Sequence, residues 1–213
     1  MAGSESGRWI GGLLGEGVCS GREPPARASV SFILPRAERF WERSDMDHRE
    51  VFKPINDAIA QSSNELARVF GYGQPRWYGL ALSDIALALQ DGEEIEFADV
   101  GVSLGSEDDD FTVDIVILSS SLLIQVHGVS AGERDERTTT VRDRATLSAL
   151  EITAGTSAFA NGLAESWPGR VSLKLTYDDE LTLTLPQSRS ANREQHGRVS
   201  ALVPALRRDL TRS

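Results

Sequence analysis

The sequence predicts an α+β fold in which antiparallel β-strands dominate, with one amphipathic helix before them and one after them. Apolar and polar side chains alternate in short segments between residues 94 and 186, which is typical of half-buried strands. Apolar residues recur at helical spacing over 54–70 and again over 199–212. A chain of 213 residues with 40% hydrophobic residues can therefore form one domain with appendages.

Residues 1–45 are expected to be a disordered N-terminal tail. Seven glycines fall in the first 21 positions, Pro24 and Pro25 follow, and no apolar period persists. Such a segment buries too little apolar surface to offset the entropy lost on ordering. A second interpretation stays open: Met46 is the natural start of the protein, and the upstream stretch is a mis-called extension.

Residues 46–79 are predicted to form a helical extension. Its apolar stripe consists of Ile55, Ile59, Leu66 and Phe70, with Ser62 and Ser63 as a polar gap. Pro54 is tolerated only near the start of a helix, so residues 46–53 are either a separate turn or a kinked lead-in. Gly71, Gly73 and Pro75 end the helix. The stripe must pack against a surface, and we favour the chain's own sheet over a second copy of the helix.

Residues 80–213 are predicted to form the β domain. Alternation predicts strands over 80–89, 94–104, 111–117, 122–126, 138–144 and 147–153, with a bulge at 98–99 and a charged loop at 132–137. For 80–89 a short helix capped by Ser83 and Asp84 is the alternative. Residues 170–186 form the clearest hairpin pattern, in which Asp178 and Asp179 make the turn. Pro204 gives the final helix a late start or a kink.

The middle of the chain resembles the bacterial pleckstrin-homology-like (PH-like) domain proteins. The resemblance rests on the strand–turn–strand unit Thr112–Gly128, on Leu147–Thr153, on the 170–186 hairpin and on the closing helix. It implies an antiparallel PH-like barrel or sandwich of seven or eight strands, capped by the C-terminal helix, over about residues 90–213. Members that bind phosphoinositides carry a basic cluster in the first hairpin, whereas this loop (107–110) is acidic. No lipid-binding residue is therefore carried over.

The charge and cysteine content limit the possible partners and the compartment. A net charge of −10 repels nucleic acid and anionic membranes, so neither is expected as a partner. The single cysteine, Cys19, cannot form an internal disulfide, which fits a reducing compartment. No apolar stretch is long enough to span a bilayer. The prediction is a cytoplasmic location.

Candidate catalytic and metal residues fit simpler structural roles. Gly101–Gly105 matches the G-x-S-x-G nucleophile elbow around Ser103, but a loop follows it where that motif needs a helix. The acidic residues Asp108, Asp109, Asp110 and Asp114 lack the spacing of a calcium loop. His48, His127 and His196 are scattered, without a second ligand at metal spacing. We predict no catalytic residue, metal or cofactor.

Two places in the sequence with aromatic residues are candidates for binding: one cluster and one single tryptophan. Arg76, Trp77 and Tyr78 lie where the helix meets the sheet, and Trp167 lies at a turn. Such residues either recognise a partner or pack the helix onto the sheet, and we favour packing. Five arginines of the closing region, at 193, 198, 207, 208 and 212, complement the helix dipole and the acidic body.

The sequence thus favours a non-enzymatic protein-interaction or regulatory module of a bacterium, acting on a protein partner or by self-association. The alternative is a small β-barrel enzyme or ligand-binding protein with a pocket between the sheets. A polar cavity that holds Ser103, His127 or an acidic pair would favour this alternative. A filled interior would favour the module.

Overall fold

The computed structural model describes residues 48–89, 93–106, 110–156, 167–188 and 190–212. The chain divides into two units, Met1–Ser44 and Asp45–Ser213, and the description below concerns the second. The predicted tail 1–45, Cys19 and the acidic residues 107–109 lie outside the described residues.

The helical region includes the residues before Pro54. Helix α2 spans His48–Ser62 with Pro54 inside it, so residues 48–53 belong to the helix and do not form a separate turn. Helix α3 (Asn64–Val69) and the 3-10 turn η1 (Phe70–Tyr72) follow. Ser63 separates the two helices by capping α3, because its hydroxyl accepts the amide N–H of Glu65 at 3.1 Å. Ile59 is fully buried in the core, so the predicted stripe is confirmed as intramolecular packing.

The strand predicted over 80–89 is wrong, because helix α4 spans Arg76–Ala88. The leucine and alanine pattern of residues 80–89 fits either a strand or a helix. The preceding pair, Trp77 and Tyr78, favours the helix, because both side chains are buried on its inner face. Trp77, Tyr78, Ala81 and Ile85 form one buried helical face. Leu80 and Leu87 remain 46% and 55% exposed. The helical region therefore extends beyond the predicted boundary at residue 79.

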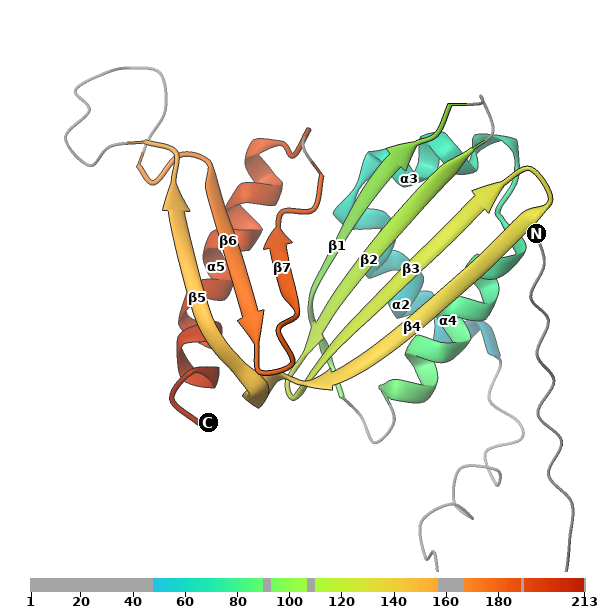
Figure 1. Ribbon diagram of the computed structural model, residues 1–213. Coiled ribbons are helices and arrows are strands. Elements are labelled where there is room, and N and C mark those ends of the chain that lie inside the picture. Colours follow the sequence, from blue (N-terminus) through green and yellow to red (C-terminus); the bar gives the residue numbers. More distant parts are fainter. Residues whose placement is uncertain (1–47, 90–92, 107–109, 157–166, 189, 213) are drawn as a thin grey trace, which may run out of the picture. The chain divides into compact units, whose positions relative to one another are not determined.

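Two antiparallel sheets and a C-terminal helix follow (Figure 1), which confirms a mainly β, α+β fold. The first sheet has the order β1-β2-β3-β4, with strands β1 (Ile95–Leu104), β2 (Phe111–Ser119), β3 (Leu122–Ala131) and β4 (Arg134–Asp143). The second has the order β5-β6-β7, with strands β5 (Leu147–Ala154), β6 (Val171–Tyr177) and β7 (Thr182–Leu185). Most of the segment expected as a charged loop at 132–137 belongs to β4. The bulge lies between Ile95 and Phe97, before the predicted 98–99.

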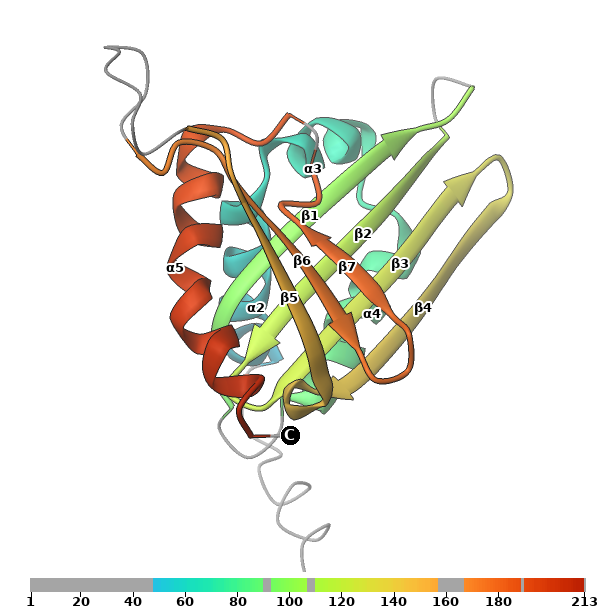
Figure 2. The ribbon, with the colours of Figure 1, turned by 60° about the vertical axis from the view of Figure 1, so that its left-hand side comes forward.

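The four-stranded sheet packs against other elements on both faces (Figure 2). One face packs on α2, α3 and α4 through Ala98, Val100, Val113, Ile115, Ile117, Ile124 and Val126. The other packs on the second sheet and α5 (Arg193–Asp209) through Phe97, Val116, Leu118 and Leu123. Because successive strand residues point to opposite faces, alternate residues of β1–β3 supply two separate cores.

The predicted hairpin and its register are confirmed. Leu173 lies opposite Leu185, and Leu175 lies opposite Leu183, with all four side chains buried. Helix α5 begins six residues earlier than expected, because Asn192 and Gln195 form a capping box. Pro204 lies within this helix.

Candidate functional site

A groove of about 590 Å³ lies between the two sheets. Its floor is the face of β2, β3 and β4 that carries Asp114, Val116, Gln125, His127, Thr138, Thr140 and Arg142. Its wall is β7 and the residues around it, from Leu181 to Ser188. This face of the sheet is polar in the groove and apolar further along the strands, where Leu118 and Leu123 belong to the core.

The polar residues of the floor form two rows across neighbouring strands. Asp114 pairs with His127, and His127 pairs with Thr138, so three strands place these side chains side by side. In the next row Gln125 lies opposite Thr140. His127 lies on the face of β3 opposite Val126, as the alternation of side chains along this strand requires.

One carboxylate–imidazole contact and one arginine organise this floor. Oδ1 of Asp114 lies 2.7 Å from Nδ1 of His127, and the two side chains are 47% and 54% exposed. This contact orients the imidazole and leaves its Nε2 without a partner among the described residues. Arg142 donates to Oε1 of Gln125 at 3.0 Å and to Oδ2 of Asp179 at 2.8 Å. The hydrogen bond from Arg142 lowers the pKa of Asp179.

The wall is the free edge of β7. The amide of Tyr177 donates to the carbonyl of Leu181 at 3.0 Å, which fixes the alternation of the β6–β7 ladder. By this alternation Leu183 and Leu185 exchange hydrogen bonds with β6, whereas the amide and carbonyl groups of Thr182 and Thr184 point away from it. No described residue donates to or accepts from these backbone groups, and β7 ends its sheet.

A buried carboxylate joins the wall to the first sheet. Asp99 is 2% exposed, and its Oδ2 accepts the amide N–H of Gln187 at 2.6 Å. Burial raises the pKa of Asp99 to about 6, and the amides of Gln187 and Val100 oppose this rise. Gly101 permits the close approach, since a Cβ there would lie 3.0 Å from Cβ of Gln187. The segment after β7 is therefore seated directly on β1.

A second hollow of about 410 Å³ adjoins the groove. Its lining includes Glu65, Gly101, Ser103, Asp114, Gln187 and Ser188. Asp114, Gln187 and Ser188 line both spaces. Glu65 accepts hydrogen bonds from the hydroxyls of Ser188, at 3.1 Å, and Ser190. The end of the groove next to the second hollow is therefore acidic.

Ser103 does not lie on a nucleophile elbow. It is inside β1, opposite Thr112, and no strand-to-helix turn follows it. His196 is bound elsewhere, with its Nδ1 2.7 Å from the carbonyl oxygen of Val171. Ser103 and His127 line adjoining spaces, but no hydrogen bond joins them among the described residues. The G-x-S-x-G segment is an ordinary strand end.

The aromatic candidates are packing residues, with one exception. Trp77 and Tyr78 are 1% and 2% exposed, so they form part of the helix–sheet core and not a recognition surface. The indole of Trp77 donates to the hydroxyl of Ser130 at 3.0 Å. Arg76 is exposed on α4. Trp167 is 67% exposed and does not line the groove.

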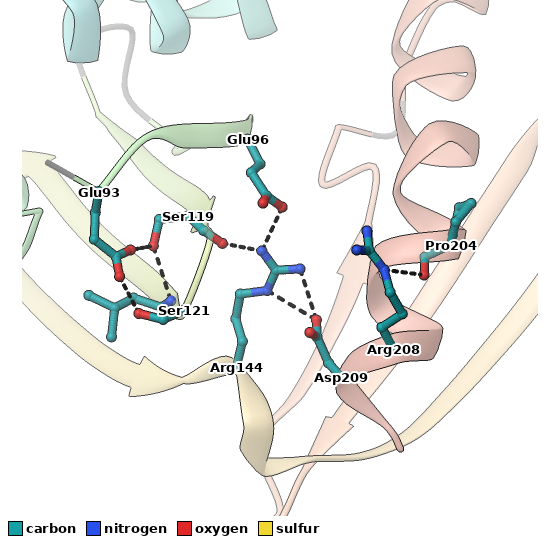
Figure 3. A network of polar contacts seen from close by, with 9 residues as sticks. Glu93, Glu96, Ser119, Ser121, Arg144, Pro204, Arg208 and Asp209 are labelled. Atoms are coloured by element: carbon teal, nitrogen blue, oxygen red, sulfur yellow. Dashed lines mark hydrogen bonds and ion pairs between the residues drawn. The ribbon is translucent and has the colours of Figure 1, made fainter. Parts of the chain in front are cut away.

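The sequence interpretation missed a buried polar network around Arg144 (Figure 3). Arg144 is 3% exposed and donates to Asp209 of α5, to Glu96 of β1 and to the carbonyl of Ser119. The partners are 25 to 65 residues away, so no local pattern marks them. Every contact is internal and the network lines neither hollow, which identifies it as a structural junction.

The part of the chain that the structure describes contains no candidate metal centre and no membrane-spanning helix. No group of three His, Cys, Asp or Glu side chains in this part of the chain is placed to hold a metal ion. None of its helices combines the length and apolar character that crossing a membrane requires.

Comparisons with known proteins do not assign a family. No family model matches the chain, and no curated protein matches it. One similar solved structure is the hSac2 domain from human phosphoinositide phosphatase Sac2, at 18% identity. The match covers 62% of this chain and 79% of that one, with a TM-score of 0.35.

Proposed function

We propose that this chain is a non-enzymatic protein-interaction module of PH-like architecture, which binds an extended segment of a partner protein in the groove. The supporting observation is that the free edge of β7 borders the groove along its length. Extended peptides bind sheet edges through main-chain hydrogen bonds and take specificity from side-chain pockets. The PH-like assignment draws on the order of a four-stranded sheet, a three-stranded sheet and a closing helix. A bacterial cytoplasm, as the sequence predicts, is the proposed setting.

A second candidate is the binding of a small polar ligand in the same groove. It is favoured by the side chains of His127, Thr138 and Gln125, which present hydrogen-bonding groups to the space between the sheets. An enzymatic role has less support, because the Asp114–His127 pair has no nucleophile within hydrogen-bonding distance among the described residues.

Panning a random peptide library against the full chain tests the module. Thr140→Trp fills the groove from its floor, whereas Thr153→Trp adds the same bulk on β5, outside the lining. The proposal predicts peptides that bind the wild type and the Thr153→Trp variant but lose at least tenfold in affinity for Thr140→Trp. Failure to select any peptide with this dependence would overturn the proposal. A small polar molecule whose binding is lost only in Thr140→Trp would then favour the second candidate.

A further inference from the structure

Resting on the proposed function, we infer that the segment bound in the groove is basic, that it adds to β7 as a new strand, and that it places a lysine or arginine side chain on Asp114. The partner is thus a protein with an exposed, extended basic segment. Two independent observations support this, one from the backbone of β7 and one from the charges of the lining.

The backbone of β7 provides the main-chain part of the site. Thr182 and Thr184 each present an amide donor and a carbonyl acceptor that have no partner among the described residues. Residues two apart on one strand edge match the hydrogen-bonding period of a second strand. The wall runs from Leu181 to Ser188, so a segment of roughly four to eight extended residues fits beside it.

The charged residues that line the groove favour a cationic side chain in the bound segment. Asp114 lies where the groove and the second hollow meet, and no lysine or arginine of the described chain pairs with it. Glu65 lines the same end and is close enough to Asp99 for its charge to raise the pKa of that residue. Arg142 is the one basic residue besides His127 in the described lining, and Asp179 and Gln125 engage it. A lysine or arginine side chain would complement this end.

The test uses the full chain and peptides selected from a random decapeptide library. Thr184→Pro removes the outward amide of β7, and proline is tolerated on such an edge, whereas Thr184→Val keeps that amide. Asp114→Asn removes the groove carboxylate, whereas Glu133→Gln removes an exposed carboxylate from the β3–β4 turn. Binding is measured by fluorescence anisotropy of labelled peptide, and circular dichroism checks that each variant folds.

We expect the selected peptides to be enriched in lysine and arginine. Thr184→Pro and Asp114→Asn should each weaken binding about tenfold, because each removes a hydrogen bond or a charge-assisted contact. Thr184→Val and Glu133→Gln should stay within about twofold. Methylating the backbone nitrogens of the peptide one at a time should abolish binding at alternate residues only, because only alternate amides of an added strand face β7. This last readout does not depend on the folding of any variant.

The inference and the proposed function fail in different ways. Peptides that need an open groove but carry no basic bias, or that ignore both Thr184→Pro and N-methylation, would overturn the inference and leave the module intact. Absence of any groove-dependent peptide would remove the proposed function as well. If the full chain doubles its mass in sedimentation and Thr184→Pro or Asp114→Asn reverses this, the occupant is a second copy and the assignment to a partner protein is wrong.

Discussion

Arg144 and Asp209, which are 65 residues apart, form the buried ion pair that connects the β4–β5 junction to the closing helix. Nε and Nη2 of Arg144 both donate to Oδ2 of Asp209, at 3.1 and 2.8 Å (Figure 3). The two side chains are 3% and 7% exposed. Among the described residues, removing Arg144 leaves the buried carboxylate of Asp209 without an ion pair, whereas removing Asp209 leaves Arg144 with Glu96 alone, whose side chain is 41% exposed.

Removing either charge should therefore destabilise the protein. We expect Arg144→Met to lower the free energy of unfolding by about 3–5 kcal/mol in urea titrations, and Asp209→Leu to lower it by less, because Glu96 still pairs with Arg144. The double variant Arg144→Met/Asp209→Leu should cost less than the sum of the two single changes, because no charge is left unpaired in the pair. Lys174→Met breaks an exposed pair with Glu151 and should cost less than about 1 kcal/mol. Equal losses in the buried and the exposed pair would contradict this account.

Asp99 should make stability depend on pH. Burial raises its pKa from 3.8 to about 6, so the folded chain holds this proton more tightly than the unfolded chain. Its stabilising contribution is complete below about pH 4 and is lost as the pH rises through about 6. Wild type should therefore lose stability relative to Asp99→Asn over this range, by on the order of 1–3 kcal/mol.

This comparison requires urea titrations of both proteins from pH 4 to pH 8. The effects of other carboxylates on stability are the same in both proteins, so they cancel when the two free energies of unfolding are subtracted. Glu133→Gln controls for the loss of one negative charge at an exposed position. A stability difference between wild type and Asp99→Asn that stays constant with pH would show that Asp99 is ionised throughout.

Two buried tyrosines offer a matched pair of substitutions. Burial raises the pKa of both Tyr78 and Tyr177 to about 12. The hydroxyl of Tyr78 donates to Oδ1 of Asn56 at 2.9 Å, whereas that of Tyr177 has no partner among the described residues. Tyr78→Phe should cost about 1 kcal/mol, and Tyr177→Phe should be neutral or stabilising in thermal unfolding. A larger loss in Tyr177→Phe than in Tyr78→Phe would mean that its hydroxyl is hydrogen-bonded.

Ile59 tests the packing of the first helix. It is fully buried on the helix-covered face of the first sheet, so Ile59→Asp places an unpaired carboxylate in the core. We expect a lower melting temperature that does not depend on protein concentration, with an unchanged mass in solution. Val51→Asp, at a residue of the same helix that is 37% exposed, should change the melting temperature little. A change of mass with an unchanged melting temperature would instead point to a helix-mediated dimer.

Local patterns are sufficient for some elements and insufficient for others. The β6–β7 hairpin follows from strict alternation around an acidic turn, and its register is as predicted. Residues 80–89 alternate leucine or isoleucine with alanine on either side of Ser83 and Asp84, which fits a strand as well as a helix. The distinction came from Trp77 and Tyr78, which bury a helical face on the sheet. The start of α5 depended on a capping box that apolar spacing does not reveal.

Local spacing was enough to predict the alternation of the β6–β7 hairpin, the apolar stripe before the first sheet and the face of β3 on which His127 lies, because these depend on neighbours a few residues apart. Which distant residues meet depends on the tertiary structure. Asp114 pairs with His127 across two strands, Asp99 accepts an amide 88 residues away, and Arg144 reaches Asp209. A polar residue on a strand has no distinctive local signal for such contacts. Its partner is selected by strand order and by the burial that makes an unpaired polar group costly.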